Sequence, residues 1–339
     1  MQPLLDWYDA GHRDLPWRSE PAPYRVWVSE IMLQQTRVEA VRGYFSRWMN
    51  ALPDIPALAA ADEAVYTKLW EGLGYYSRVR NLHRAAVLLC EQYGGELPAD
   101  YDKLLSLPGV GEYTAGAVAS IAFGLPVPAV DGNVLRVAAR LDNDFTPITD
   151  AKFKKQTRER FAALMPSDRS GDLNQSLMEL GATVCLPNGA PRCADCPIQH
   201  LCEGFHRGNA AVLPLRAAKK ARRVEKRTVL VVRCGQLVGL RQTPNKGLLA
   251  GLWELPSLAG HLSPDELRAA LTEMGWSVRK LLSLRPARHI FTHVEWHMNG
   301  VYVELDAPAP ALTFVTPAEL RDAYALPSAF RSFVSVLED

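Results

Sequence analysis

The sequence predicts a two-domain protein in which an all-helical domain is followed by a smaller α+β domain. The chain has 339 residues, which is enough for two hydrophobic cores. A Gly-Pro turn between two helical segments lies near residue 108, and strand-like segments begin only after a basic stretch at 216–227. We therefore expect a helical domain over 1–211, a basic linker over 212–226 and an α+β domain over 227–339.

Composition limits the classes of function. Hydrophobic residues make up 48% and charged residues 22% of the chain, as in soluble globular proteins. Because the net charge is only +1, any nucleic-acid binding must depend on local basic patches. The N-terminus shows no signal-peptide pattern, and the most apolar stretch, 115–130, is interrupted by Gly and Pro. We expect a cytoplasmic protein with no membrane partner.

Residues 24–50 are expected to be helical, with a break at 34–36. Glu30 is the only charged residue in the apolar run 26–33. Burial favours the neutral form of a carboxyl group and raises its pKa, which suits a general acid. An acid that faces solvent or pairs with an arginine explains this pattern equally well.

Residues 70–78 place two glycines and two adjacent tyrosines, Tyr75 and Tyr76, before a basic run. Such a loop can insert an aromatic side chain between stacked bases. A helix connection with a packed tyrosine is the commoner explanation of such a loop, so the residues alone leave both interpretations open.

Residues 104–133 contain a hairpin-like pattern followed by a single acid. The turn LPGVG contains Gly109, Val110 and Gly111, whose glycines allow close approach of the backbone. The helix that begins near Tyr113 offers its first amides to an anion, and Asp131 follows on an extended segment. The pattern predicts a phosphate-binding hairpin beside a reactive carboxylate, although by itself it also fits an ordinary interhelix turn.

Four of the six cysteines lie in one short loop with the spacing C-x7-C-x2-C-x5-C: Cys185, Cys193, Cys196 and Cys202. In a cytosol-like protein this arrangement indicates a metal site rather than disulfides. Zinc and a [4Fe-4S] cluster both accept four thiolates. The compact loop favours the cluster, and zinc stays open as the alternative.

The last part of the chain contains a predicted β-hairpin and two helix starts. Residues 228–240 alternate as a hairpin that turns at Cys234-Gly235. Ser263 and Thr316 each begin a capping box with proline at the first helical position. The basic stretch before this part fits either a linker near DNA phosphates or a solvated linker.

Five motifs in this order carry a family resemblance: SEIMLQQT at 29–36, GLGYYSR at 72–78, LPGVGEYTAGAV at 107–118, VDGNV at 130–134 and the four-cysteine loop at 185–202. Together they resemble the helix–hairpin–helix DNA glycosylases that carry an iron–sulfur cluster, with the hairpin near 104–123. Within that superfamily the chain is similar to the MutY-type adenine DNA glycosylases. The resemblance implies base excision repair by a monomer that flips adenine out of duplex DNA, where it is mispaired with 8-oxoguanine or guanine.

The resemblance also implies roles for individual residues. Glu30 matches the general acid and Asp131 the carboxylate that stabilises the oxocarbenium ion, with Tyr113 and Asn133 as further catalytic residues. The positions that contact DNA in the family are Gln35, Thr36, Leu73, Tyr75, Gly109, Val110 and Gly111, and those of the adenine pocket are Arg18 and Gln175. The four cysteines match the ligands of a [4Fe-4S] cluster, although seven residues separate Cys185 from Cys193, one more than is usual.

Tyr113 distinguishes two chemistries within the superfamily. Bifunctional members carry a lysine at this position, which forms a Schiff base and cleaves the strand. A Schiff base requires an amine, which tyrosine lacks. The sequence therefore predicts a monofunctional enzyme that leaves an abasic site and has no strong lyase activity.

The part from residue 227 onwards resembles the MutT/Nudix-like domain with which these glycosylases recognise 8-oxoguanine. Aligned on Gly275, two of the three positions for metal-binding glutamates are Ala269 and Thr272. Without those oxygens a metal-dependent pyrophosphatase cannot hold its metal well, so we expect recognition without hydrolysis. The segment Phe291, Thr292 and His293 matches the lesion-contact loop, in which the family usually has serine at the position of Thr292.

Two alternatives are weighed against this interpretation. A bifunctional endonuclease of the same superfamily is disfavoured by Tyr113 and by the second domain. A non-catalytic iron–sulfur DNA-binding protein is disfavoured by the joint presence of Glu30 and Asp131.

Overall fold

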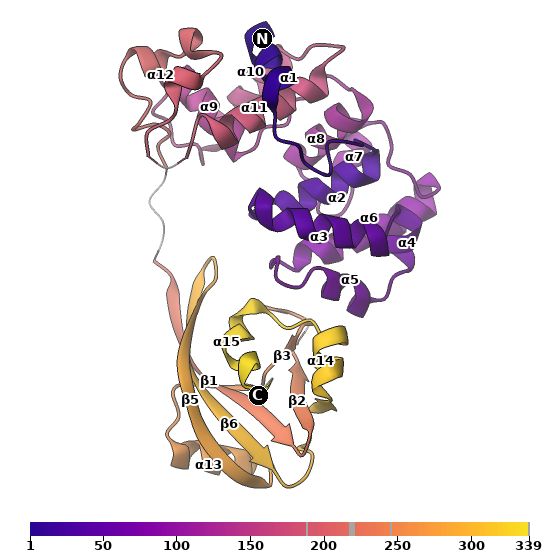
Figure 1. The fold of residues 1–339 in the computed structure, drawn as a ribbon, viewed down its shortest axis with the longest axis vertical. Helices are drawn as coiled ribbons and strands as arrows, with labels where there is room; N and C mark the ends of the chain where they lie inside the picture. Colours follow the sequence, from indigo (N-terminus) through magenta and orange to yellow (C-terminus); the bar gives the residue numbers. More distant parts are fainter. Residues whose placement is uncertain (188, 217–220, 245, 338–339) are drawn as a thin grey trace. The chain divides into compact units, whose positions relative to one another are not determined.

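The computed structural model describes residues 1–187, 189–216, 221–244 and 246–337. The chain divides into two compact units, Met1–Ala61 with Ser77–Ala218 and Asp62–Tyr76 with Lys219–Asp339 (Figure 1). The first unit is helical and the second contains a mixed sheet with helices, so the predicted fold class is confirmed. None of the helices in the described part of the chain combines the length and the apolar character that crossing a membrane requires.

The first unit consists of α-helices and short 3₁₀ turns. They are α1 (Gln2–Gly11), α2 (Pro23–Leu33), α3 (Val38–Ala51), α4 (Ile55–Ala60), α6 (Ser77–Tyr93), α7 (Tyr101–Leu105), α8 (Glu112–Phe123), α9 (Gly132–Leu141), α10 (Ala151–Ala162), α11 (Ser170–Thr183), η1 (Cys193–Asp195), η2 (Gln199–Leu201) and α12 (Glu203–His206). The predicted break at 34–36 falls between α2 and α3, as expected.

Helix α8 forms the centre of this unit and packs against α2, α7 and α11. Its residues from Thr114 to Ser120 are all buried, and most of them are small. Small side chains let neighbouring backbones approach closely, which a helix buried on every side requires. The helix ends at Gly124 in the left-handed conformation (φ 68°), where the amide of Leu125 donates to the carbonyl of Ala119 in a Schellman arrangement.

Asn174 of α11 holds the segment that leads from α8 to α9. Its Oδ1 accepts from the amide of Ala129 at 2.9 Å, and its Nδ2 donates to the carbonyl of Val127 at 2.9 Å and to Ser120 Oγ at 2.7 Å. The side chain is 1% exposed, so these bonds replace water for an otherwise extended stretch of backbone. Asn174 therefore fixes the residues immediately before Asp131.

The second unit is built on a seven-stranded sheet in the order β3-β2-β1-β6-β5, with β4 paired to β1 and β7 paired to β2. Its elements are α5 (Glu63–Leu69), β1 (Arg223–Cys234), β2 (Leu237–Gln242), β3 (Trp253–Glu254), β4 (Ser257–Ala259), α13 (Pro264–Glu273), β5 (Val278–Ile290), β6 (Val294–Leu305), β7 (Thr313–Val315), α14 (Pro317–Ala323), η3 (Ser328–Phe330), α15 (Arg331–Val334) and η4 (Ser335–Leu337). Strands β1 and β6 run parallel, and the other pairs are antiparallel.

Successive side chains of β1 point to opposite faces of the sheet, and a helix packs against each face. Val229 lies in one core cluster with Phe333 of α15, and Leu230 lies in another with Leu267 of α13. The predicted hairpin turn at Gly235 (φ 57°) is confirmed, and so are the capping boxes of Ser263 and Thr316.

The boundaries differ from the expected ones at two places. Residues 62–76 were expected in the helical domain, but they belong to the second unit, where Lys68 Nζ donates to the carbonyl of Tyr324 at 3.1 Å and Glu71 Oε1 accepts from the amide of Leu326 at 2.7 Å. Of the expected linker 212–226, residues 217–220 lie outside the described residues, and 223–226 pair with β6 as the start of β1. These contacts are long-range, so local sequence patterns do not reveal them.

The contact between α8 and the segment before α9 leads to a prediction about stability. A Cβ atom at Gly116 would lie 2.4 Å from the carbonyl oxygen of Pro128, whereas one at Gly11 of α1 would have nothing within 4 Å. We expect Gly116→Ala to lower the free energy of unfolding by about 1–3 kcal/mol, because backbone must move to admit the methyl group. We expect Gly11→Ala, measured by the same chemical denaturation, to be neutral or slightly stabilising. Equal stability of the two variants would contradict this packing.

Candidate active site

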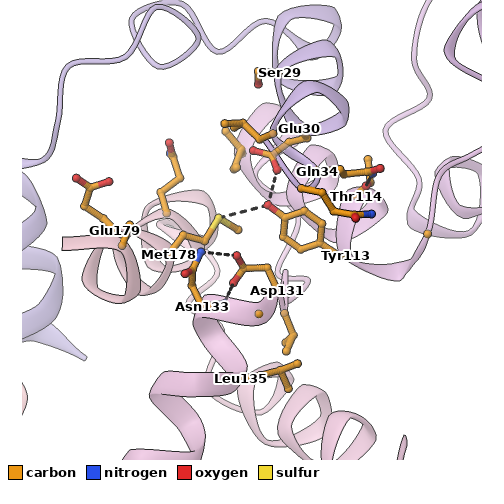
Figure 2. A pocket seen from close by; sticks show the side chains of 18 of the residues that line it. Ser29, Glu30, Gln34, Tyr113, Thr114, Asp131, Asn133, Leu135, Met178 and Glu179 are labelled. Carbon is orange, nitrogen blue, oxygen red and sulfur yellow. Dashed lines mark hydrogen bonds between the residues drawn. The ribbon is translucent and has the colours of Figure 1, made fainter. Parts of the chain in front are cut away.

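A cavity of about 910 Å³ opens in the helical unit, and its wall contains residues of α2, α8, α9 and α11. Ten of the residues predicted from the sequence line it: Arg18, Glu30, Gln35, Thr36, Gly109, Gly111, Tyr113, Asp131, Asn133 and Gln175. Figure 2 shows Glu30, Tyr113, Asp131 and Asn133 together in this cavity. The tertiary structure therefore brings together residues that lie more than a hundred positions apart.

Glu30 lies near the end of α2 and is 5% exposed. Tyr113, at the start of α8, donates its hydroxyl hydrogen bond to Glu30 Oε2 and also lies 3.7 Å from Met178 Sδ (Figure 2). Burial raises the pKa of Glu30 to about 7; the hydrogen bond from Tyr113 opposes that shift, and the charge of Asp131 adds to it. Glu30 can thus hold a proton near neutral pH.

Asp131 is the N-cap of α9, which the sequence analysis described only as an extended position. Its Oδ1 accepts from the amides of Asn133 and Val134, each at 2.8 Å, and its Oδ2 accepts from Asn133 Nδ2 at 2.7 Å. Burial raises the pKa of Asp131, and these three hydrogen bonds together with the charge of Arg136 act against that rise. The first turn of a helix is a favourable place for a negative charge, so this carboxyl group is held as an acceptor.

Asn133 connects Asp131 to a buried arginine. Its Oδ1 accepts from Arg136 Nη2 at 2.8 Å. The same guanidinium donates to the carbonyl of Gly181 at 2.6 Å and to that of Cys185 at 2.8 Å. Arg136 is 3% exposed, so α9, α11 and the start of the cysteine loop are joined by one charged group.

The sequence analysis missed Glu179, an acid on the opposite wall. It is 2% exposed and accepts from Arg13 Nε at 2.7 Å and from Arg18 Nη2 at 2.9 Å. Burial opposes ionisation, but these hydrogen bonds and positive charges lower the pKa of Glu179 below its usual value. Glu179 lies four positions after Gln175 on α11, and this spacing along one helix face is the signal that could have identified it.

The other predicted contact residues lie elsewhere. Val110 is buried in the hairpin turn and does not line the cavity. Leu73 and Tyr75 belong to the second unit, together with the segment 291–293. There the hydroxyl groups of Tyr75 and Thr292 are 2.7 Å apart and hydrogen-bonded, although sequence analysis had placed them in separate domains.

The lesion-contact segment predicted in the second unit follows β5. Phe291 packs edge-on against Trp296 at a centroid distance of 4.8 Å and against His289 at 4.5 Å. Thr292 and His293 are exposed at the turn between β5 and β6. The aromatic contacts anchor Phe291, and the two polar side chains remain at the surface.

The four loop cysteines are free thiols. Burial raises the pKa of Cys196 to about 11; a backbone hydrogen bond from Ile198 opposes this shift, and the charges of the other three cysteines add to it. Arg140 Nη1 is 3.1 Å from Cys185 Sγ. Within the described residues, no three His, Cys, Asp or Glu side chains are arranged to hold a metal ion, so the geometry leaves the predicted cluster untested.

Comparisons with known proteins identify both parts of the chain. The model of the HhH-GPD superfamily of base excision DNA repair proteins matches residues 28–164, and that of the NUDIX domain matches residues 228–336. The adenine DNA glycosylase of Mus musculus is 37% identical over 99% of this chain and 77% of its own length. A thermostable thymine-DNA glycosylase (TM-score 0.54, 27% identity) and a non-covalent endonuclease III–DNA complex (TM-score 0.52, 25% identity) each cover 61% of this chain and 94% of their own.

The helical unit, with a buried and a half-buried carboxyl group in one cavity, is that of a base excision DNA repair glycosylase. The chain belongs to the adenine DNA glycosylase family. It is thus a DNA-repair enzyme that acts on adenine in DNA, and endonuclease III-like glycosylases of the HhH-GPD family are known to carry iron–sulfur clusters. The resemblance inferred from the five motifs is confirmed.

The raised pKa of Glu30 predicts a pH-dependent stability. The folded protein retains a proton that the unfolded chain releases between about pH 4.5 and 7, so the free energy of unfolding should fall as pH rises through this window. Glu30→Gln removes the buried charge and should be more stable than the unmodified protein at pH 8, by about 2 kcal/mol, with a smaller difference at pH 5. Chemical denaturation at both pH values measures the effect. Glu91→Gln, at an exposed position, is the matched control for the loss of one acid. A Glu30→Gln difference that is the same at both pH values would contradict the shift.

Proposed function

We propose that the protein hydrolyses the N-glycosidic bond of adenine mispaired with 8-oxoguanine or guanine in duplex DNA and leaves an abasic site. The observation that carries this proposal is the contrast between two carboxyl groups in one cavity, the buried Glu30 and the half-buried Asp131. Glu30 receives a single hydroxyl hydrogen bond, whereas Asp131 receives three N–H hydrogen bonds. Such a contrast separates an acid from a carboxylate at the same pH.

Glu30 is the proposed general acid. Adenine leaves poorly as an anion, and a proton delivered to its N7 lets it depart as a neutral base. With a pKa of about 7, Glu30 still carries a proton in a large share of molecules at neutral pH. Once ionised, it becomes the base for the attacking water, and the hydroxyl of Tyr113 stabilises that charge.

Asp131 is the proposed partner of the sugar cation. As the base departs, the sugar acquires oxocarbenium character, which a fixed carboxylate stabilises by charge or by a transient covalent bond. Its orientation is set in advance by the first turn of α9 and by Asn133, so little reorganisation accompanies the reaction. Arg18 and Gln175, which line the same cavity, are proposed to contact the extruded adenine.

The absence of an amine at Tyr113 supports monofunctional chemistry. Among the lining residues of the described cavity, Lys154 is the single lysine. It lies on α10, whereas the reacting groups are on α2 and α9, so strong lyase activity is not expected. Gln35, Thr36 and the hairpin glycines are proposed to grip or probe the duplex, and the exposed Tyr75 to enter the base stack. Leu73, which the sequence analysis placed beside it at the DNA, is buried at 6% exposure and is proposed to support the Tyr75 loop instead.

The second unit is proposed to recognise 8-oxoguanine rather than to hydrolyse nucleotides. Ala269 and Thr272 occupy two positions at which a Nudix hydrolase has metal-binding glutamates. The exposed hydroxyl of Thr292 can exchange hydrogen bonds with the altered edge of the base, in the role expected of serine. Its contact with Tyr75 adds a link between lesion recognition and the proposed wedge residue.

The cysteine loop is proposed to hold a [4Fe-4S] cluster. Four free thiols in one short loop, with the guanidinium of Arg140 beside Cys185, fit a group that carries negative charge. Cys185, Cys193, Cys196 and Cys202 would hold it. When bound, the cluster would cross-link the segment 185–202 through four iron–thiolate bonds.

The proposed function predicts alkali-dependent strand breaks. A duplex with adenine opposite 8-oxoguanine should break at that adenine only when hot alkali follows the enzyme. Asp131→Asn should lower single-turnover product by more than about 100-fold and retain duplex binding, because the cation loses its carboxylate. Asparagine is also a good N-cap, so α9 should remain intact.

The other outcomes of this assay are equally informative. Breaks without alkali would show lyase chemistry, with Lys154 as the first candidate nucleophile. No breaks under either condition would contradict the proposed function. A fully active Asp131→Asn enzyme would remove Asp131 from the mechanism.

The role of Thr292 predicts a change in lesion preference. Thr292→Val removes the hydroxyl with little change in shape, and we expect the ratio of kcat/KM for adenine opposite 8-oxoguanine to that opposite guanine to fall about 3- to 10-fold, as for one lost hydrogen bond. The matched variant Thr313→Val, at an exposed position of β7, should leave the ratio unchanged. An unchanged ratio in Thr292→Val would show that this hydroxyl does not read the lesion.

A further inference from the structure

The C-terminal end of α2 lacks the usual glycine cap. Helix α2 ends at Leu33, and Gln34 adopts a non-helical conformation with ψ 113°. The last carbonyl groups of a helix need partners from outside it. The carbonyl of Leu33 accepts a hydrogen bond from the amide of Thr36 at 3.2 Å. The carbonyls before and after it must be paired by another segment.

Arg78, on the first turn of α6, supplies that partner. Its Nη1 donates to the carbonyl of Ile31 at 2.8 Å and to that of Met32 at 3.1 Å, and it also donates to the carbonyl of Gln34. Its Nη2 lies 3.5 Å from Thr36 Oγ1. The arginine is 8% exposed, so one buried guanidinium donates hydrogen bonds both to the end of α2 and to the turn after it.

The turn held by Arg78 carries a residue in an unfavourable conformation. Gln35 has φ 58°, in the left-handed region that residues other than glycine seldom adopt. Such a conformation persists only where surrounding contacts enforce it. Gln35 and Thr36 both line the cavity, and Gln34 Nε2 donates to Thr114 Oγ1 of α8 at 3.2 Å. The turn is therefore fixed from two sides, by α6 and by α8.

We propose that Arg78 is a positioning residue that holds the turn at 34–36 so that Gln35 faces the duplex and helps to extrude the target adenine. This inference rests on the proposed function, in particular on the role of Gln35 at the DNA. Arg78 is not among the described residues that line the cavity. It acts through the backbone of the turn, and five donors on a rigid planar group suit this task better than a single ammonium does.

A double-mutant cycle tests whether Arg78 acts through Gln35. Arg78→Met keeps apolar volume and removes the donors, and we expect it to lower the single-turnover excision of adenine opposite 8-oxoguanine about 10- to 100-fold, a loss consistent with one or two charge-assisted hydrogen bonds. Gln35→Ala should also lower this rate. If Arg78 acts through Gln35, the double variant should be no slower than the slower single variant, because coupled residues are not additive. A double variant slowed by the product of the two single-variant effects would overturn the proposal.

A second measurement separates positioning from loss of structure. Adenine placed opposite a one-nucleotide gap is already unpaired, so its excision by Arg78→Met should fall at most about 3-fold, since extrusion of an unpaired base needs little help. A general weakening of the fold would slow both substrates equally, and that result would also overturn the proposal. Arg78→Lys should recover only part of the rate on the fully paired duplex.

The matched control is Arg25→Met. Arg25 lies on the N-terminal half of the same helix, and its Nη2 donates to the carbonyl of Pro16 at 2.9 Å. This variant removes a half-buried guanidinium without touching the turn, so the ratio of rates on the two substrates should stay at the unmodified value. Thermal melting of all variants identifies those that are unfolded at the assay temperature.

The unmodified enzyme on the same duplex tests the proposed function separately. If it excises adenine and Arg78→Met does so equally fast, only the inference about Arg78 fails. If the unmodified enzyme excises no adenine opposite 8-oxoguanine or guanine, the proposed function fails, and the role of Arg78 fails with it.

Discussion

The hydrogen bonds that Asp131 accepts from the first turn of α9 fix a carboxyl group in the wall of the cavity. A buried carboxyl group ordinarily favours its neutral form, and burial does raise the pKa of Asp131. Two backbone amides and the side chain of Asn133 favour the charged form in compensation. Glu30 accepts a single hydroxyl hydrogen bond, from Tyr113, and burial raises its pKa to about 7. One structural device, an N-cap, thus gives Asp131 three N–H donors that favour its charged form and that Glu30 lacks.

The position of that N-cap depends on close packing around α8 and α11. Asn174 holds the extended backbone before Asp131, and Gly116 lets that backbone lie directly against α8. Gly181 does the same on the other side, because a Cβ atom there would lie 2.6 Å from the Cβ of Asn133. A site built by backbone contact rather than by long side chains holds its geometry well, since few rotamers are available to change it.

The second unit shows how a short insertion can belong to a different part of the protein than its neighbours in sequence. Residues 62–76 are flanked on both sides by the helical unit, yet α5 packs with α14, and Lys68 and Glu71 bond to the backbone near 324–326. Tyr75, which follows α5, meets Thr292 from β5's end. The two residues expected to sense the duplex and the lesion are therefore neighbours within one compact unit.

The sequence alone determined the features that depend on one or two turns of chain. The break after α2, the hairpin glycines, the hairpin at Gly235 and both capping boxes follow from local spacing and from the hydrogen bonds of neighbouring residues. The tertiary structure decided the rest. Glu179 meets Arg13 across 166 residues, and Arg78 meets Ile31 across 47, so no local pattern could reveal either pair. Burial, which decides whether an acid such as Glu30 keeps its proton, is a property of the assembled fold and not of the segment that carries the residue.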